Sequence, residues 1–271
     1  GVYLNPIFQS PSNHRYDTAN YARIDPELGT EENFASLVGA LHENGMRVML
    51  DGVYNHASWQ HPFWQDVLKN GEKSAYFDWF CGVSMEVLRG KTSKELTADV
   101  MRGEKPFESF AFAADMPKWN TENPAVQDYL IGTAAEWTRK YGVDAWRLDV
   151  PDEVSFCFLE HFKKRIRETN PEAYIIGEIW QKSTAWLRAG VFDGAMDYPL
   201  YFAIRDFAMK RTDGVETFAE RIKDVFLSAP DCVRPRQLAF CGNHDIPRPL
   251  TVCGGDTDRL AAALFLQMLL G

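Results

Sequence analysis

The sequence predicts an α/β fold in which parallel strands alternate with helices, and three observations support this prediction. Short runs of strand-forming residues recur along the chain, longer amphipathic stretches separate them, and polar residues follow most of the runs. Repeated strand–helix–strand units specify a parallel sheet with crossover helices. The polar residues then indicate which kind of parallel sheet is expected, because barrels and doubly wound sheets place their sites differently.

Six short runs have the composition of buried strands. They are Val2–Phe8, Arg47–Tyr54, Val143–Val150, Ala173–Trp180, Val191–Tyr198 and Gln237–Cys241. Nearly every run ends in an acidic or amide residue, namely Asn5, Asp51, Asp149, Glu178, Asp197, and Asn243 to Asp245. Polar groups at the C-terminal ends of many strands are typical of a (β/α)8 barrel, whereas a doubly wound sheet concentrates its site at one switch point. The sequence therefore favours an incomplete (β/α)8 barrel.

Helices are expected between these runs. Thr30 is a candidate N-cap for a helix over residues 31–44, and Gly45 is a candidate C-terminal stop. A second helix is expected from Pro124 to Tyr141, before Gly142, and a third from about Glu153 to Glu168, before Asn170-Pro171. Further helices are expected at Leu200–Lys210, Val215–Leu227 and Asp256–Leu270.

One interval, between Tyr54 and about Thr121, is far longer than a loop between a strand and a helix should be. It is rich in aromatic residues, namely Trp59, Phe63, Trp64, Tyr76, Phe77, Trp79 and Phe80. We interpret residues 57–119 as a small inserted subdomain over the barrel mouth. Residues 1–56 and 120–271 then form the catalytic barrel.

Composition and charge narrow the class of protein. With 271 residues, 45% hydrophobic and 25% charged, the chain has ordinary globular composition. A net charge of -9 disfavours nucleic acid and anionic membranes as partners and is compatible with a neutral substrate. Five cysteines without a CxxC pair or a Cys/His cluster indicate reduced thiols, which favours a cytoplasmic location. The longest apolar stretch, Leu260–Leu270, is too short to cross a bilayer.

Four segments combine strand ends with several polar side chains. They are DGVYNH at 51–56, GVDAWRLD at 142–149, GEIW at 177–180 and GNHD at 242–245. Each segment taken alone also has a purely structural explanation. In the order of the four segments, these explanations are solvated loop residues, a structural Arg–Asp bridge, a buried hydrogen-bonded Glu and a plain turn.

Taken together, the four segments meet the needs of one reaction. Arg147 and Asp149 are two apart on a strand, so they point to the same side, and the guanidinium keeps the carboxylate ionised as a nucleophile requires. Glu178 has apolar neighbours, and desolvation favours the protonated form that a general acid needs. Glycosidic cleavage with retention uses such a pair of carboxyl groups, ~5 Å apart.

In order and spacing, these four segments resemble the signature regions of the α-amylase superfamily, glycoside hydrolase family 13. Between them, SPSNHRYDTANYARIDPELGT, MPKWNTENPAV and FDGAMDYPL resemble the neopullulanase, cyclomaltodextrinase and maltogenic amylase branch. The resemblance covers essentially the whole chain. It implies that residues 1–8 form strand two of the barrel and that the last helix of the chain precedes strand eight. The chain then resembles a barrel without its first and last βα units, without the C-terminal β domain and without the N-terminal domain of that branch.

The resemblance also implies a role for each matching residue. Asp149 is the expected nucleophile, Glu178 the acid/base and Asp245 the carboxylate that grips sugar hydroxyls. Arg147 is expected to align Asp149. The residues expected to contact the sugar are Tyr16, which stacks beneath it, His56 and His244, and the expected supports of the site floor are Asp51 and Asn55. Apart from the resemblance, Trp180 lies two residues past Glu178 on the same predicted strand, so its ring either faces the leaving-group side of the cleft and binds sugar there or packs under the loop.

No cofactor is expected, with calcium left open as the alternative. In classical α-amylases the Asn of the first region binds calcium, together with a backbone group of a Lys-His pair after the nucleophile. Here Val150-Pro151-Asp152-Glu153 follows Asp149, so the usual calcium site looks incomplete. Four further residues depart from the family pattern near expected sugar subsites, and they leave the preferred glucan open: Arg15, Asn20, Trp119 and Gln181.

The sequence therefore predicts a retaining α-glucan hydrolase that acts on maltooligosaccharides, cyclomaltodextrins, pullulan or starch, with transglycosylation as a side activity. An α-glucosidase or a glucanotransferase of the same superfamily stays open as an alternative. A catalytically silent scaffold module is disfavoured, because Arg147 and all three expected carboxylates are present. The sequence does not indicate the oligomeric state.

Overall fold

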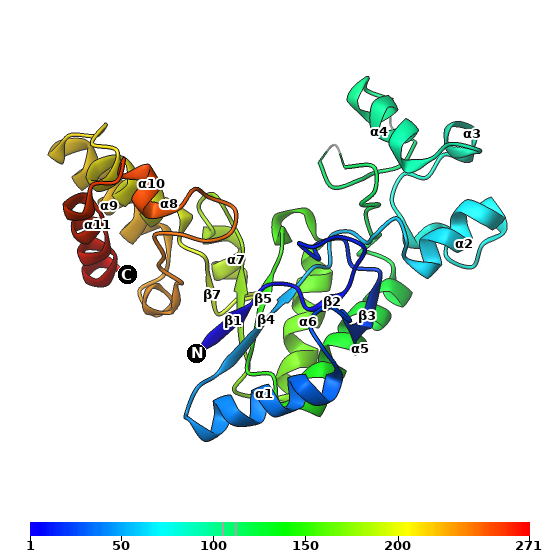
Figure 1. Ribbon diagram of the computed structural model, residues 1–271, viewed down its shortest axis with the longest axis horizontal. Coiled ribbons are helices and arrows are strands. Elements are labelled where there is room, and N and C mark those ends of the chain that lie inside the picture. Colours follow the sequence, from blue (N-terminus) through cyan, green and yellow to red (C-terminus); the bar gives the residue numbers. More distant parts are fainter. Residues whose placement is uncertain (105, 112) are drawn as a thin grey trace. The chain divides into compact units, whose positions relative to one another are not determined.

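The computed structural model describes residues 1–104, 106–111 and 113–271, which divide into two compact units, residues 1–174 and 175–271. In the first unit, strands β1 (Val2–Leu4), β4 (Val48–Gly52) and β5 (Ala145–Leu148) pair in parallel in that order (Figure 1). The register places Asp51 directly beside Arg147. Two polar residues predicted at separate strand ends therefore become neighbours.

The run Val2–Phe8 was expected to form one strand, and this expectation is wrong. Strand β1 ends at Leu4, and β2 (Phe8–Gln9) pairs antiparallel with β3 (Asn20–Ile24) in a separate two-stranded sheet. Pro6 lies at the break. Because proline has no N–H to donate to a ladder, the chain leaves the first sheet at this point.

The helices of the first unit begin and end close to the predicted residues. Helix α1 (Glu31–Glu43) starts at a capping box, in which Thr30 accepts from the Asn33 N–H. Helix α5 (Pro124–Tyr141) ends at Gly142, which takes the left-handed conformation with φ of 70°. Helix α6 (Phe156–Thr169) starts later than predicted, because Pro151–Glu153 form a separate 3-10 turn. Helices α5 and α6 pack against each other.

The long interval of the sequence contains helices α2 (Pro62–Asn70), α3 (Met85–Leu88) and α4 (Ser93–Met101), with 3-10 turns at Gly71–Lys73 and Phe77–Trp79 (Figure 1). Isolated β-bridges join His56 to Lys118 and Phe80 to Trp119. The interval belongs to the first compact unit. A separate subdomain of residues 57–119 over the barrel mouth stays a prediction.

The second unit is built on β6 (Tyr174–Gly177) and β7 (Gly194–Ala195), which pair in parallel. Its helices are α7 (Thr184–Ala189), α8 (Tyr198–Ile204), α9 (Val215–Ser228), α10 (Pro249–Val252) and α11 (Thr257–Leu270), and a π-helical turn at Arg205–Met209 extends α8. The strand predicted at Gln237–Cys241 is reduced to one parallel bridge between Leu238 and Met196. A 3-10 turn at Arg234–Arg236 directly precedes it and leaves few residues extended.

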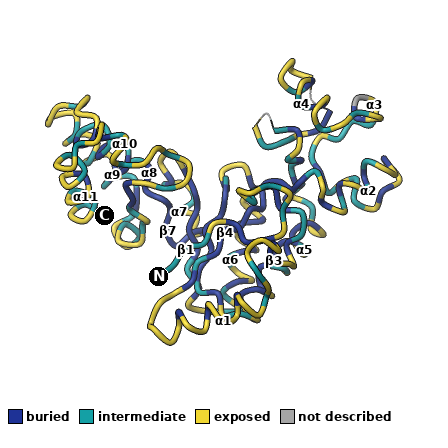
Figure 2. The backbone as a smooth tube through the Cα atoms, viewed as in Figure 1, coloured by how far each residue is buried: buried dark blue, intermediate teal, exposed yellow. Residues whose placement is uncertain are grey.

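Two strands of the first unit lie deep in its core. Strands β4 and β5 are buried almost throughout (Figure 2). Trp146 on β5 is completely buried and donates its indole N–H to the Thr138 hydroxyl of α5 at 3.0 Å. The rings of Tyr54, Phe158 and Phe162 pack nearby with centroids 5.4–6.3 Å apart. This packing holds the polar strand ends in place.

Two glycines beside predicted site residues have no room for a side chain. A Cβ atom on Gly177, just before Glu178, would lie 2.4 Å from the Phe192 ring. A Cβ atom on Gly52, just after Asp51, would lie 2.5 Å from the Tyr54 ring. Only glycine lets these rings lie directly against the strand backbone.

All five cysteines are free thiols, as the sequence predicts. In the part of the chain that the structure describes, no helix is long and apolar enough to cross a membrane.

Candidate active site

The predicted site residues fall into two groups, one in each compact unit. The first unit holds Tyr16, Asp51, Asn55, His56, Arg147 and Asp149, and the second holds Glu178, Trp180, His244 and Asp245. The expected short separation of the Asp149 and Glu178 carboxyl groups stays a prediction.

In the first unit, one guanidinium nitrogen joins two carboxylates. Arg147 Nη1 donates to Asp149 Oδ1 at 2.8 Å and to Asp51 Oδ1 and Oδ2 at 2.8 and 3.0 Å. The three side chains are at most 8% exposed. A buried cation beside a buried carboxylate stabilises the ionised form. One oxygen of Asp149 is thus anchored beside a fixed positive charge, an environment that suits a carboxylate nucleophile.

Two phenols complete the environment of Asp51. The Tyr3 hydroxyl donates to Asp51 Oδ2 at 2.6 Å and the Tyr16 hydroxyl donates to the same oxygen at 2.8 Å. Burial, and next the Asp51 charge, raise the pKa of both phenols well above the usual value, so they stay protonated donors. Tyr16 therefore supports Asp51 in addition to its predicted stacking role. Tyr3 was not predicted, although it lies on β1 two residues before Asn5.

His56 is completely buried and neutral. Its Nε2 donates to the Tyr16 carbonyl at 3.1 Å, its Nδ1 faces the Asn55 side-chain nitrogen at 3.4 Å, and its ring stacks on Phe110 at 4.7 Å. Burial lowers the pKa of His56 to about 4. The hydrogen bond to a sugar that the resemblance implies would have to replace one of these contacts.

Asn55 corresponds to the asparagine that binds calcium in classical α-amylases. In this chain its side chain contacts an ion pair. Its side-chain nitrogen lies 3.4 Å from Glu153 Oε2, and Lys118 Nζ lies 3.2 Å from the same oxygen. Calcium requires six to eight oxygen ligands. Among the described residues no group of three or more acidic, His or Cys side chains is placed to hold a metal. With Lys118 beside the Glu153 carboxylate, the residues present do not fit a calcium site.

In the second unit, Glu178 is held by neutral donors. The indole N–H of Trp180 donates to Glu178 Oε1 at 3.0 Å, and the Tyr198 hydroxyl lies 3.5 Å from the same atom. The Trp180 ring stacks on Tyr198 with centroids 4.2 Å apart and stays 44% exposed. Trp180 thus positions Glu178 and also presents an exposed ring face.

The turn that carries Asp245 is tied to the same tyrosine. Asn243 Nδ2 donates to the Tyr198 hydroxyl at 2.8 Å, and Asn243 Oδ1 accepts from the Asp245 N–H at 3.0 Å. His244 Nε2 lies 3.2 Å from Asp245 Oδ2. Tyr198 therefore links Glu178 with the turn at Asp245. Tyr198 had no predicted role, and its position in FDGAMDYPL was the available signal.

Of the residues that depart from the family pattern, Trp119 is not placed to touch a sugar. It is only 1% exposed, and its indole N–H donates to the Tyr21 hydroxyl at 3.1 Å. Trp119 is thus a core residue, which corrects its placement near a sugar subsite. Arg15 pairs with Asp25 and Glu27 at 3.5 and 2.8 Å.

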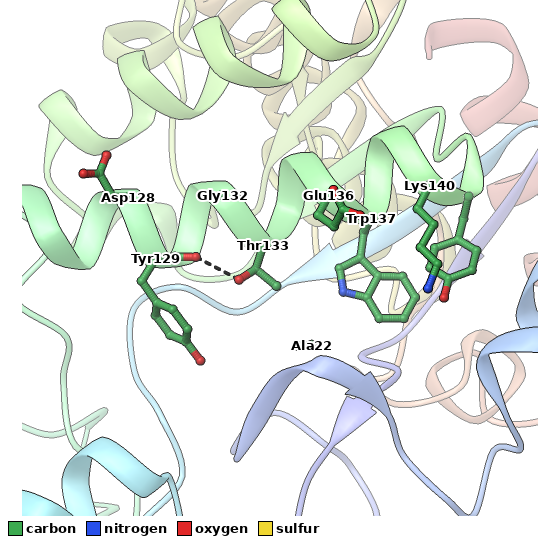
Figure 3. A pocket seen from close by; sticks show the side chains of 9 residues that line it. Ala22, Asp128, Tyr129, Gly132, Thr133, Glu136, Trp137 and Lys140 are labelled. Atoms are coloured by element: carbon green, nitrogen blue, oxygen red, sulfur yellow. Dashed lines mark hydrogen bonds between the residues drawn. The ribbon is translucent and has the colours of Figure 1, made fainter.

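A surface pocket of about 370 Å³ runs along α5 (Figure 3). Its lining residues are Ala22, Asp128, Tyr129, Gly132, Thr133, Glu136, Trp137, Lys140 and Tyr141. Trp137 is buried and donates its indole N–H to the Tyr21 carbonyl, and Lys140 Nζ lies 4.8 Å above the Tyr141 ring. These rings are engaged in packing, and none of the predicted site residues lines the pocket.

The chain matches the family described as "Alpha amylase, catalytic domain" over residues 1–271. The protein therefore belongs to the α-amylase family of glycoside hydrolases. This confirms the predicted fold class, a partial (β/α)8 barrel, and the resemblance to the α-amylase superfamily.

Curated relatives place the chain near one branch of that family. It is 41% identical to a cyclomaltodextrinase from Geobacillus thermopakistaniensis (strain MAS1), with 99% of this chain and 44% of the relative covered. It is 40% identical to a maltogenic α-amylase from Bacillus acidopullulyticus, with 99% and 44% covered. It is 38% identical to neopullulanase 2 from Thermoactinomyces vulgaris, with 98% and 44% covered. The chain thus spans less than half the length of these relatives.

Solved structures agree. A cyclomaltodextrinase superposes with a TM-score of 0.88 at 38% identity, covering 97% of this chain and 43% of that one. The ligand-free cyclic α-maltosyl-(1→6)-maltose hydrolase from Arthrobacter globiformis superposes with a TM-score of 0.86 at 31% identity, covering 97% and 56%.

Proposed function

We propose that the protein is a retaining α-glucan hydrolase that cleaves α-1,4-glucosidic bonds, and α-1,6 bonds in addition, in maltooligosaccharides, cyclomaltodextrins, pullulan or starch. The observation that carries the proposal is the buried Arg147, which donates a hydrogen bond to Asp149 at 2.8 Å at the end of β5. Membership of the α-amylase family and relatives named cyclomaltodextrinase and neopullulanase support the substrate class.

The proposed reaction is a double displacement. Asp149 attacks the anomeric carbon while the Glu178 carboxylic acid protonates the departing glycosidic oxygen, and a covalent glycosyl-enzyme forms. Glu178, now ionised, takes a proton from a water molecule, which displaces Asp149 and gives a product of α configuration. When the hydroxyl of a second sugar replaces the water, the same step becomes transglycosylation.

The surrounding residues hold the reacting groups in place. Arg147 keeps one oxygen of Asp149 anchored, and the hydrogen bond from Trp180 restrains Glu178. Asp245, with His244 beside it, is assigned to the sugar hydroxyls. Donors that already point at a carboxylate need no rearrangement during the reaction.

The proposal extends to partners and location. A neutral glucan fits the net charge of -9, which disfavours nucleic acid and anionic membranes. Five free thiols favour a reducing compartment, and a relative at 39% identity is named intracellular maltogenic amylase, from Bacillus subtilis (strain 168). We therefore propose a cytoplasmic enzyme that works without a metal cofactor.

The test is a product profile of the full-length protein on β-cyclodextrin, pullulan and soluble starch. We expect short maltooligosaccharides from all three, with the α-anomer appearing first by proton NMR. An initial β-anomer would contradict the retaining mechanism. Glucose released only from linear chain ends would indicate an α-glucosidase, and transfer without a net gain of reducing ends would indicate a glucanotransferase. No product from any substrate would indicate a silent module.

A further inference from the structure

The residue after the proposed nucleophile has an unusual backbone conformation. Val150 follows Asp149 and lies in the left-handed region, with φ of 42° and ψ of 48°. A β-branched side chain rarely adopts this region, and such a conformation persists only where the surrounding structure holds it. The 3-10 turn Pro151–Glu153 follows at once. Something at this turn must therefore hold the chain in place.

Glu153, the last residue of the turn, makes the holding contacts. Its Oε2 lies 3.2 Å from Lys118 Nζ and 3.4 Å from the side-chain nitrogen of Asn55. Asn55 is completely buried in the segment after β4, and its side-chain oxygen has no hydrogen-bond partner among the described residues. The turn after β5 is thus joined to the segment after β4 through one carboxylate.

Lys118 is itself fixed by the backbone. It forms an antiparallel bridge with His56, the Ala57 N–H donates to the Pro117 carbonyl at 2.9 Å, and the Trp119 N–H donates to the Asn55 carbonyl at 3.0 Å. Its side chain is 19% exposed. An ammonium on a fixed backbone loses less freedom when it pairs than one on a mobile loop.

The charges of the turn require a cation. Asp149, Asp152 and Glu153 place three carboxylates within five residues, and Arg147 serves the first of them. Lys118 pairs with Glu153. Burial raises the pKa of Asp152, and the charge of Lys118 offsets a small part of this rise. In classical α-amylases the asparagine that matches Asn55 binds calcium, whereas here an ammonium pairs with the adjacent Glu153 carboxylate.

We propose that Lys118 is a positioning residue whose ammonium acts as a built-in cation, anchoring Glu153 and thereby the strained turn that follows Asp149. Calcium then has no part at this place. The role of this turn in positioning a nucleophile rests on the proposed function. The anchoring of the turn by Lys118 and Glu153 does not rest on it.

The first experiment compares variants of the full-length protein. Lys118→Met should lower Tm by about 1–4 °C, the shift expected from losing one ion pair in which the Glu153 side chain is 42% exposed. It should also lower kcat roughly fivefold or more, with KM changed less than twofold. Lys118→Arg keeps the cation and should stay near wild type. Glu153→Gln should match Lys118→Met, and the double variant should lose no more than either single one.

Val150→Gly tests the strain directly. Glycine adopts the left-handed region freely, so the turn no longer depends on its anchor. Added to Lys118→Met, it should restore at least half of the wild-type kcat. A purely structural Lys118 would lower Tm without changing kcat, and no glycine would rescue activity. Either that result or unchanged Tm and kcat in Lys118→Met would overturn the proposal.

The metal is tested by melting without any activity assay. We expect the Tm of the wild type to change between excess EDTA and millimolar calcium by no more than the Tm of Glu153→Gln changes between the same two conditions. A calcium-dependent rise that disappears in Glu153→Gln would place a metal at this carboxylate and overturn the proposal. If the protein lacked hydrolase activity altogether, the proposed function would fail, and the melting and double-variant results would still decide the anchoring.

Discussion

The two units hold their key carboxyl groups in different ways. Asp149 is bound by a buried guanidinium that it shares with Asp51, whereas Glu178 accepts a hydrogen bond from the neutral indole of Trp180 and faces the neutral phenol of Tyr198. A guanidinium stabilises only the ionised form, but a neutral donor can serve a carboxylate and also the carbonyl oxygen of a carboxylic acid. The contrast suits a nucleophile that must stay ionised and an acid/base that must gain and lose a proton.

The largest effect is expected from removing either carboxyl group. Asp149→Asn and Glu178→Gln should each lower kcat by roughly four decades, as when a catalytic nucleophile or base is removed, with the near-UV spectrum unchanged. A substrate with a good leaving group, such as an α-glucosyl fluoride, should separate the two. It needs no protonation, so Glu178→Gln should regain its first step and Asp149→Asn should not. Equal recovery, or a tenth of wild-type activity in either variant, would refute the assignment.

A second difference should appear in stability. Arg147→Met leaves Asp51 and Asp149 buried without their shared cation, and breaking a buried ion pair costs about 3–5 kcal/mol. Tyr198→Phe in the other unit removes one neutral hydroxyl and should cost about 1 kcal/mol. Urea unfolding of the two variants measures both. Similar losses would mean that the two carboxyl groups are held alike.

The first unit should also carry a pH-dependent part of the stability. Burial lowers the pKa of His56 to about 4. Between about pH 4 and pH 6.5, the folded state therefore binds fewer protons than the unfolded state. This contribution, at most about 3 kcal/mol, is present above pH 6.5 and is lost as the pH falls toward 4. His61, whose pKa burial lowers to about 3, adds a second such contribution. Urea unfolding at pH 4.5 and pH 7 should show a smaller difference in His56→Gln than in wild type.

The smallest effect concerns substrate choice. Trp180→Ala removes an exposed ring and a hydrogen bond to Glu178, and kcat/KM should fall roughly fivefold or more for cyclodextrin or pullulan, the equivalent of about 1 kcal/mol. Maltotriose should lose less. Trp180→Phe is the matched control, because it keeps an aromatic ring to stack and loses the N–H that donates to Glu178. Equal losses on all substrates, with a lower Tm, would assign Trp180 to packing.

Much of the fold follows from short-range signals in the sequence. Helix α5 begins and ends at the predicted residues, because Asn123 and Pro124 start it and Gly142 stops it. Two differences from the prediction depend on which strands pair, and strand pairing is not a local property of the sequence. They are the break after Leu4 and the reduction of Gln237–Cys241 to a bridge.

The site divides in the same way. Arg147 and Asp149 share a side of one strand, so their contact could be predicted from spacing alone. Asp51 joins them through the register of β4 and β5, and Lys118 reaches Glu153 from 35 residues away. No periodicity in the sequence encodes such contacts. The burial of Trp119 depends likewise on Tyr21, almost a hundred residues earlier.

The glycines that lie against aromatic rings also bear on how this protein can change. A single methyl group at Gly177 would push the Phe192 ring or the backbone that carries Glu178, and one at Gly52 would do the same beside Asp51. Random substitution at these two positions should therefore yield almost no active protein. Trp180, almost half exposed, tolerates change far better. Selection for a new glucan is thus expected to act on the rings and loops around the carboxyl groups, while the backbone beneath them is inherited unchanged.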